Sequence, residues 1–430
     1  MSLFNIYNRN NIILEAISSA KNLYCNAFED NYINPSAIEA LQFYNSNIRR
    51  TPTSDNSALG MDASEIFNNT RSKILKSMNL SSYEWDVIFT GNKESACSLA
   101  VEIVSRNVDL ANAIKASANR KDNKYNIYIN KYCDNNMLFS SVRQANFLKR
   151  KYTLFDEDIA FDTSKLRVVV MPIIDKSLGL NWWTYFTSKI GAKRFVDQKK
   201  PLEYIILDGS NAGEHIFMSK TKTYYNPASA IILSGCDIGG VDMGILVIRK
   251  ELLKINHFNK PIGTINNIEK LQNNIPCFGE NKFVCSYNNT SSVIALSAAI
   301  DDLKSQSSKY RNSVEEIIKL KRAIITNSSK SLFEVKHNNR LVKVYNKMSQ
   351  PSMALNIASH KKDIDSLYKI LIESNIICRI HEPNQIPTVT STKEQLRYVQ
   401  LSFDHQFLQN KEAIAELISR LYDITLNLHE

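Results

Sequence analysis

Short apolar runs alternate with helical apolar patterns along the first 300 residues, and this alternation predicts an α/β fold. Helices are expected over 62–78 and 94–105, where apolar residues recur every three or four positions. Each apolar run ends at small or polar residues and predicts a buried strand, at 85–90, 126–129, 166–171, 203–207, 231–233 and 245–248. Strands that alternate with helices are typical of a largely parallel sheet.

The pattern changes after residue 300 and predicts a second, smaller α/β domain. A helix over 307–326 leads to it, followed by helices near 363–373 and 411–426. Strands are expected near 333–336, 341–345, 352–357, 376–380 and 397–401. We therefore predict an N-terminal helix within 1–24 that packs on the small domain, a large domain over 25–300 and a small C-terminal domain over 301–430.

Composition narrows the class of protein. The net charge of +10 is spread over 430 residues, so nucleic-acid binding is not expected. Seven cysteines without CxxC spacing argue against disulfides and against a metal site. No apolar run approaches the roughly 20 residues of a membrane helix. The first residues also lack the basic segment and apolar core that are typical of a signal peptide. We predict a cytoplasmic protein, and the many Asn, Ile and Lys residues suit an AT-rich genome such as that of a large insect virus, which would place it in an infected host cell.

Two stretches hold the candidate chemistry. The strand over 203–207 delivers Asp208 at its carboxyl end, where α/β folds place functional groups. The strand over 85–90 runs into TGNKESA at the start of a helix, and free amides at a helix N-terminus attract anions. A third segment, AIILSGCDIGGVDMGILVIRK from Ala230, is expected to form a strand, a tight glycine loop and a second strand.

Together these motifs resemble the class V pyridoxal-phosphate enzymes, namely the NifS-type cysteine desulfurases and the sulfurase domain of molybdenum cofactor sulfurases. The resemblance implies the pyridoxal-phosphate-dependent transferase fold type I. Such a fold has a large domain with a mainly parallel seven-stranded sheet and a smaller C-terminal α/β domain. The resemblance also implies a homodimer, because the active site of the family spans two subunits.

The resemblance assigns five binding positions to this chain. Asp208 takes the place of the acid that bonds the ring nitrogen of the cofactor, and Asn211 replaces a nearby glutamine. Asn136 stands where a histidine stacks on the ring. Thr290 opens a helix that gives a phosphate contact to the neighbouring subunit, and Arg397 would bind the substrate carboxylate.

Three positions lose the chemistry of the family pattern, and Asn136, which has no ring to stack on the cofactor, is the first of them. Asp237 occupies the place of the lysine that forms the Schiff base, and Glu94 occupies that of a phosphate-binding threonine. Two like charges about 4 Å apart repel by about 4 kcal/mol at an effective dielectric constant near 20, and Lys93 would offset only part of this. Glu94 can instead cap its own helix. A persulfide-forming cysteine is also not identified, because Cys378 lies outside the family phrase.

These departures predict a pseudoenzyme without a cofactor and without catalytic residues, retained as a binding or structural component with an unknown protein partner. The alternative is an active pyridoxal-phosphate-dependent cysteine desulfurase or sulfurase that uses an atypical lysine. Lys176, Lys220 and Lys222 are the candidates for that lysine, because no lysine occurs between Lys222 and Arg249. Whether the chain is an enzyme stays open at this point.

Overall fold

The computed structural model describes part of the chain, in two compact units. One unit comprises residues 31–310, and the other comprises 1–30 together with 311–430. Residues 1–21 of the predicted N-terminal helix lie outside the described residues, as do 308–326, and Leu23–Tyr24 at the end of that prediction form a strand instead of a helix. The described residues are 22–25, 34–47, 58–119, 125–155, 166–174, 181–183, 203–218, 225–239, 241–253, 290–307, 333–334, 354–359, 364–381, 398–403, 407 and 410–427.

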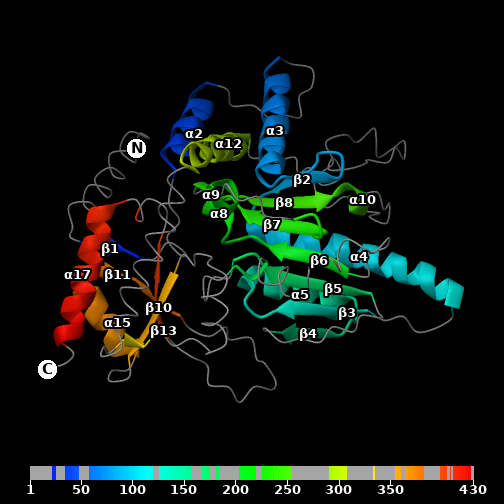
Figure 1. The fold of residues 1–430 in the computed structure, drawn as a ribbon. Coiled ribbons are helices and arrows are strands. Elements are labelled where there is room, and N and C mark those ends of the chain that lie inside the picture. The colour runs from blue at the N-terminus through cyan, green and yellow to red at the C-terminus, as the bar shows by residue number, and fades with distance from the viewer. Residues whose placement is uncertain are drawn as a thin grey trace. The chain divides into compact units, whose positions relative to one another are not determined.

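A seven-stranded sheet forms the centre of the unit over 31–310 (Figure 1). Its strand order is β2-β8-β7-β6-β5-β3-β4, and every strand except β8 runs in the same direction. The strands are β2 (Trp85–Thr90), β3 (Asn126–Asn130), β4 (Tyr152–Phe155), β5 (Arg167–Pro172), β6 (Glu203–Asp208), β7 (Ala230–Ser234) and β8 (Gly244–Arg249). This confirms the predicted fold class, an α/β protein built on a mainly parallel sheet.

The inner strands are apolar along their whole length because helices cover both faces of a parallel sheet. Each residue of β2, β5 and β7 is buried, and Val168, Val169 and Val170 are fully inaccessible. β-Branched side chains suit such positions, since they pack well on a pleated surface. The apolar runs of the sequence therefore correspond to the centre of the sheet.

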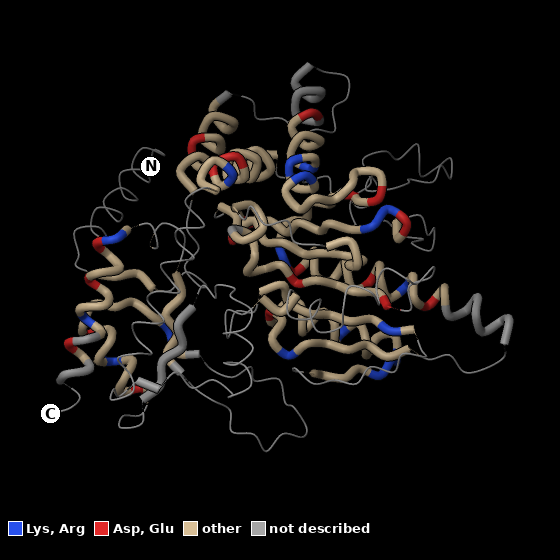
Figure 2. Tube along the Cα trace, viewed as in Figure 1, with Lys and Arg blue, Asp and Glu red and all other residues tan. Residues whose placement is uncertain are grey.

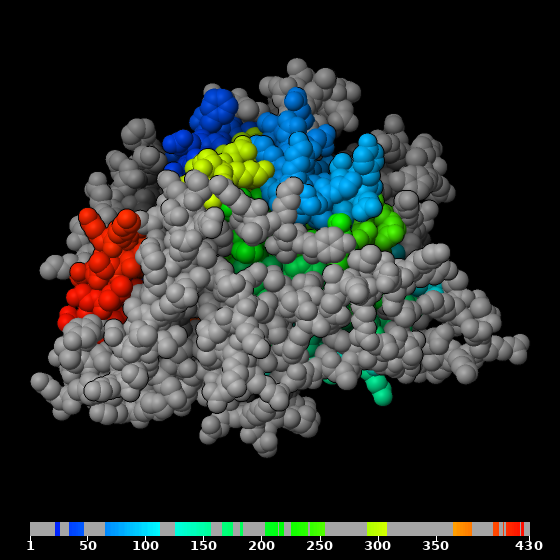
Figure 3. Space-filling view, viewed as in Figure 1, coloured from blue at the N-terminus to red at the C-terminus, as the bar shows by residue number. Residues whose placement is uncertain are grey.

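Two groups of helices pack around this sheet. The long helix α4 (Lys93–Asn119) packs on β7 and β8 and against α5 (Asn135–Phe147). The second group, which we call the helical layer, comprises α2 (Pro35–Asn47), α3 (Ala58–Ser77) and α12 (Thr290–Ser305). Their side chains adjoin on the face shown in Figure 3. Short helices α8 (Gly213–Met218), α9 (Cys236–Gly239) and α10 (Lys250–Leu253) complete the unit.

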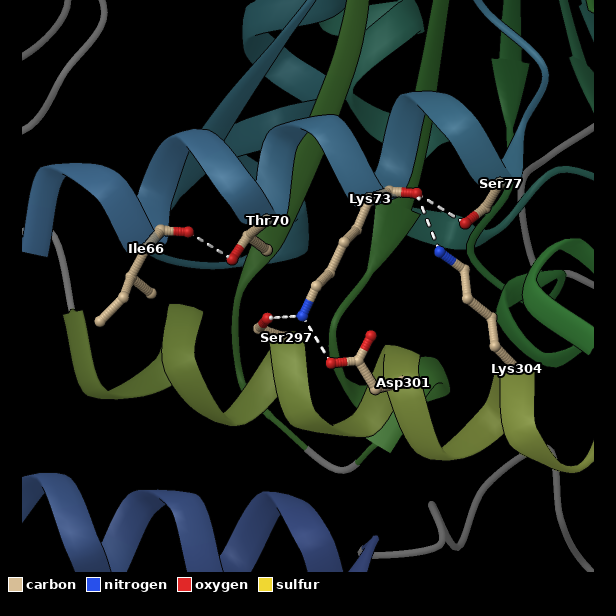
Figure 4. A network of polar contacts seen from close by, with 7 residues as sticks. All are labelled: Ile66, Thr70, Lys73, Ser77, Ser297, Asp301 and Lys304. Carbon is tan, nitrogen blue, oxygen red and sulfur yellow. Dashed lines mark hydrogen bonds and ion pairs between the residues drawn. The ribbon is translucent and has the colours of Figure 1, made fainter.

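Polar contacts tie the helical layer together above its apolar packing (Figure 4). The amine of Lys73 donates to Ser297 Oγ at 2.7 Å and pairs with Asp301 Oδ2 at 2.5 Å. Lys304 Nζ reaches back to the carbonyl oxygen of Lys73 at 3.4 Å. At the start of α2, Asn34 Oδ1 accepts from the amide of Ser36 at 2.9 Å, which is an ordinary N-cap contact.

The other unit contains two small sheets. Strands β12 (Arg379–His381), β13 (Tyr398–Ser402), β10 (Ala354–Ser359) and β9 (Phe333–Glu334) form an antiparallel sheet in that order. β1 (Leu23–Tyr24) pairs in parallel with β11 (Ile376–Ile377). Helices α15 (Ile364–Glu373) and α17 (Lys411–Asn427) belong to the same unit. The single strand predicted over 376–380 is thus two strands that belong to different sheets.

Acidic and basic residues are interspersed along the described trace (Figure 2). Among the described helices, none has both the length and the apolar character needed to span a membrane.

Candidate functional site

The candidate site lies at the edge of the sheet where the parallel strands end. Thr90, Asn130, Pro172, Asp208 and Ser234 are the last residues of β2, β3, β5, β6 and β7. Functional groups in open α/β sheets gather at this edge, because strand ends and the loops that follow them converge there. All residues of the site belong to the unit over 31–310.

Gly244 allows the turn after β2 to approach this edge closely. It pairs with Thr90 on one side and with Ser234 on the other. A Cβ atom at position 244 would collide with the carbonyl oxygen of Asn92 and with the hydroxyl group of Thr90. That hydroxyl donates to the same carbonyl at 2.8 Å. Only glycine therefore lets the start of α4 lie against the sheet.

Asp208 is the buried acid of the site, with 1% of its surface exposed. Its Oδ2 accepts from the backbone amide of Asp134 at 2.7 Å. Its Oδ1 accepts from the amide of Ser210 at 3.1 Å and from the hydroxyl group of Ser210. Burial raises the pKa of Asp208, and the neighbouring charge of Asp134 raises it further, while these hydrogen bonds oppose the shift.

Asp134 connects this acid to a lysine. Lys93, the first residue of α4, pairs with Asp134 Oδ2 at 3.1 Å. Asp134 Oδ1 accepts from the amide of Asn136 at 2.9 Å and so caps α5. Burial lowers the pKa of Lys93, but the charges of Asp134, Asp237 and Asp208 outweigh it and raise that pKa above its ordinary value. The lysine is therefore a cation that is paired with Asp134 and that the charges of Asp237 and Asp208 stabilise further.

Asp237 approaches from the loop between β7 and β8. It lies in the short helix α9, whose backbone packs tightly on α8, since a Cβ atom on Gly213 would lie 2.8 Å from the carbonyl oxygen of Asp237. The neighbouring Cys236 is partly exposed. Burial raises the pKa of its thiol, as do the charges of Asp242 and Asp237, whereas the charge of Lys93 lowers it. The amine of Lys93 is thus electrostatically coupled to both α5 and α9.

Two further thiols, those of Cys97 near this edge and of Cys378 in the other unit, have pKa values that favour the protonated form. Burial raises the pKa of the Cys97 thiol, one turn along α4 from Lys93, and the charge of Asp208 adds to the shift. Burial also raises the pKa of Cys378 to about 12. The thiolate is the nucleophile in persulfide chemistry, so neither group is prepared for it.

The predicted site residues are only partly brought together. Asp208 and the amide of Asn136 both contact Asp134. Glu94 is exposed in the first turn of α4, and the cap of that helix is Asn92, whose Oδ1 accepts from the amide of Ser95 at 2.8 Å. Asn211 is partly exposed, and Thr290 is buried as the first residue of α12. Arg397, Lys176, Lys220 and Lys222 lie outside the described residues.

Sequence reasoning missed two members of the cluster, Lys93 and Asp134. The sequence assigns Lys93 only the role of a partial counter-charge to Glu94, and it assigns no role to Asp134. One signal was present, because both residues open a helix directly after a strand of the parallel sheet. Residues in that position converge at the same edge.

Comparison with known proteins supports the fold. No protein-family model and no curated protein sequence matches the chain. An apo cysteine desulfurase from Thermococcus onnurineus NA1 is similar, with a TM-score of 0.66, 13% identity and 95% of each chain covered. The cysteine desulfurase CsdA from Escherichia coli gives a TM-score of 0.65, 14% identity and 95% coverage of each chain. A NifS-like protein from Rickettsia africae ESF-5 gives 0.63 and 14%, with 94% of this chain and 99% of that chain covered.

These similarities overturn the prediction that the chain has no cofactor. The fold shared with the cysteine desulfurases is that of the class V pyridoxal-phosphate enzymes, and it points to pyridoxal phosphate. The donor set fits that group at two points. Asp208 offers a buried carboxyl group for a ring nitrogen, and Lys93 offers an amine next to it through Asp134. The resemblance read from the sequence is confirmed, and this chain has the fold of the NifS-like cysteine desulfurases.

Proposed function

We propose that this chain binds pyridoxal phosphate at the carboxyl edge of its seven-stranded sheet and acts on an amino acid as a NifS-like enzyme. The observation that carries the proposal is the buried Asp208 carboxyl group, supported by the Asp134 amide and by Ser210. The cofactor would supply an electron sink for the breaking of bonds at the α-carbon of an amino acid.

The residues of the chain would hold charge and orientation. Burial raises the pKa of Asp208, so a nearby cation would favour the ionised form of this carboxyl group. A protonated ring nitrogen is such a cation. Asp134 fixes the Asp208 carboxyl group through its amide and holds Lys93 through its side chain. Asp134 would thus orient both the Asp208 carboxyl group and the Lys93 amine toward the cofactor.

Equilibrium dialysis of the full-length chain against pyridoxal phosphate tests this proposal. Asp208→Asn is expected to weaken retention about 10- to 100-fold, since a hydrogen bond to a charged group contributes about 1.5–3 kcal/mol. Asp109→Asn is the control, because Asp109 pairs with Arg150 away from the cluster. A wild-type chain that retains no cofactor, or equal retention by wild type and Asp208→Asn, would contradict the proposal.

A second candidate is a cofactor-binding pseudoenzyme that serves as a binding or structural component. Two observations favour it, the aspartate at position 237 and the raised pKa values of the thiols of Cys97, Cys236 and Cys378. Incubating the cofactor-loaded chain with L-cysteine and other amino acids separates the candidates. Release of sulfide and alanine, or consumption of another amino acid, supports the enzyme. Retained cofactor with no amino acid consumed supports the pseudoenzyme.

We further propose a homodimer in the cytoplasm, on the strength of the family resemblance. Sedimentation of the purified chain over a range of concentrations tests the dimer. A monomer at every concentration would remove this part of the proposal without affecting the cofactor site. The viral source and an additional protein partner stay predictions from the sequence.

A further inference from the structure

Lys93 occupies an uncommon environment for a lysine at the start of a helix. Cations are ordinarily disfavoured at a helix N-terminus, because the helix dipole is positive there. Lys93 is nevertheless the first residue of α4, and only 23% of its side-chain surface is exposed. Its Nζ atom pairs with Asp134 Oδ2 at 3.1 Å. The sequence has placed an amine at the sheet edge against the preference of the helix, which indicates a role beyond helix stability.

We propose that Lys93, in place of the residue at position 237, supplies the amine that binds the cofactor aldehyde covalently. This inference rests on the proposed function, since it assumes that pyridoxal phosphate occupies the edge of the sheet. The inference concerns which lysine supplies the amine. From the sequence, only Lys176, Lys220 and Lys222 were candidates for this role.

The position of Lys93 satisfies the first requirement, which is that the amine lies near the ring partner but apart from it, because the aldehyde is attached opposite the ring nitrogen. Lys93 Nζ and Asp208 Oδ2 both contact Asp134, one through its side chain and the other through its backbone amide at 2.7 Å. The charge of Lys93 also acts on Cys236, next to Asp237 in α9. The amine therefore contacts Asp134 directly and interacts electrostatically with the loop that carries position 237.

The covalent step balances without another reactant. The Lys93 ammonium group loses two protons, its nitrogen forms a double bond with the aldehyde carbon, and the aldehyde oxygen leaves with both protons as water. The product nitrogen keeps one hydrogen and one positive charge, so the charge at Lys93 is the same before and after. No oxidant, reductant or external acid is consumed.

This conservation of charge explains how a lysine held among carboxylates can still react. The three carboxylates raise the pKa of Lys93 and slow its loss of a proton. They also stabilise the protonated product, because it carries its positive charge at the same place. The ion pair with Asp134 is interrupted while the neutral amine attacks the aldehyde, and it can form again once the product nitrogen carries the positive charge. Asp237 then has a function as a counter-ion, where the family pattern has the amine itself.

Chemical trapping with site mapping tests the inference without measuring activity. The full-length chain is incubated with a limiting amount of pyridoxal phosphate, reduced with borohydride, digested and analysed by mass spectrometry. We expect the reduced cofactor on the peptide that contains Lys93. Lys93→Arg keeps the cation but cannot form the double bond, so its peptide should carry no cofactor. Lys369→Arg, at a surface position with 77% of its side chain exposed, is the control and should label as the wild type does.

The outcomes separate this inference from the proposed function. Cofactor on a different lysine, with Lys93 unmodified in the wild type, overturns the inference and leaves the proposed function standing. The same holds if dialysis shows retention and borohydride traps nothing. No retention by the wild type overturns both. The wild-type map is decisive even if Lys93→Arg fails to fold, and trapping on Lys93 in a chain that equilibrium dialysis shows to retain the cofactor supports both.

Discussion

Two lysine–aspartate pairs in the unit over 31–310 differ in what surrounds them. In the helical layer, Lys73 pairs with Asp301, and their side chains are 31% and 57% exposed. At the sheet edge, Lys93 pairs with Asp134, and the exposed fractions are 23% and 9%. Lys73 has a serine as its other partner, whereas the charges of Asp237 and Asp208 act on Lys93 in addition to that of Asp134. The same residue types thus form a surface contact in one place and a charge cluster in the other.

The difference shows what each pair contributes. The helices that Lys73 joins are already held by a buried apolar face, in which Ile74, Leu296 and Ala299 are each 0% exposed. Exposed ion pairs add little to such packing, because water screens them. At the sheet edge, Asp208 is only 1% exposed, so its ionised form depends on hydrogen bonds and on nearby cations. We conclude that Lys73 is replaceable and that Lys93 is not.

The largest expected effect concerns the apolar face of the helical layer. Leu296→Ala should lower the free energy of unfolding by about 2–5 kcal/mol, the usual range for a fully buried leucine. Phe139→Ala, at a position 71% exposed in α5 of the same unit, should change it by less than about 0.5 kcal/mol. Urea denaturation of both variants measures the contrast. Similar small losses for both would mean that polar contacts, not packing, hold α12.

A smaller loss is expected at the sheet edge. Lys93→Ala leaves three carboxylates without their cation and should cost about 1–3 kcal/mol of unfolding free energy. Because the Asp134 side chain is only 9% exposed, about 1 M salt should recover little of this loss. Lys93→Arg should recover most of it. Urea denaturation at low and high salt is the measurement, and full recovery by salt would place the pair with ordinary surface contacts.

The pH dependence of the free energy of unfolding tests whether the pKa of Asp208, in the same cluster, is raised in the folded chain. Its pKa in the folded chain is raised above the ordinary value of 3.8, first by burial. The folded state therefore binds this proton more tightly than the unfolded state. The stability that Asp208 contributes is fully present below pH 3.8 and is lost as the pH rises through the folded pKa. Without cofactor, the free energy of unfolding of the wild type should fall relative to that of Asp208→Asn as the pH rises, as urea denaturation at several pH values would measure. A change in the opposite direction would contradict the raised pKa of Asp208.

The smallest effect is expected at the surface pair. Lys73→Ala should cost less than about 1 kcal/mol, and about 1 M salt should abolish the difference from the wild type. The same urea titrations measure it, with Lys93→Ala beside it as the matched comparison. A loss at Lys73 that equals the loss at Lys93 and survives salt would remove the distinction between the two pairs.

Much of the fold could be predicted because burial leaves a simple pattern. The inner strands were recognised from continuous apolar runs, to within one or two residues at each end. β4 was missed, since Tyr152 and Thr153 are exposed at the outer edge of the sheet and follow basic residues. The segment between β7 and β8 was expected to be a loop, but it contains the short helix α9. The predicted helix over 94–105 was too short, because the later turns of α4 carry polar residues that interrupt the apolar pattern.

The site was harder to predict than the fold. Asp208 could be found because a strand-end acid follows from local pattern alone. The contact of Lys93 with Asp134 joins residues 41 positions apart, and that of Asp134 with Asp208 joins residues 74 apart. Such contacts depend on which strands are neighbours in the sheet, and the periodicity of one segment does not contain this information.

The parallel pair of β1 and β11 has a consequence for the order of folding. Leu23 and Cys25 donate to the carbonyls of Asn375 and Ile377 at 2.8 Å, and Cys25 accepts from Ser402 at the same distance. A ribosome completes more than 350 residues between these partners, so the earliest strand emerges long before its neighbours exist. The unit over 31–310 can fold first. The segment around Leu23 has to stay unpaired until the last quarter of the polypeptide, which contains its partner strands, has been synthesised.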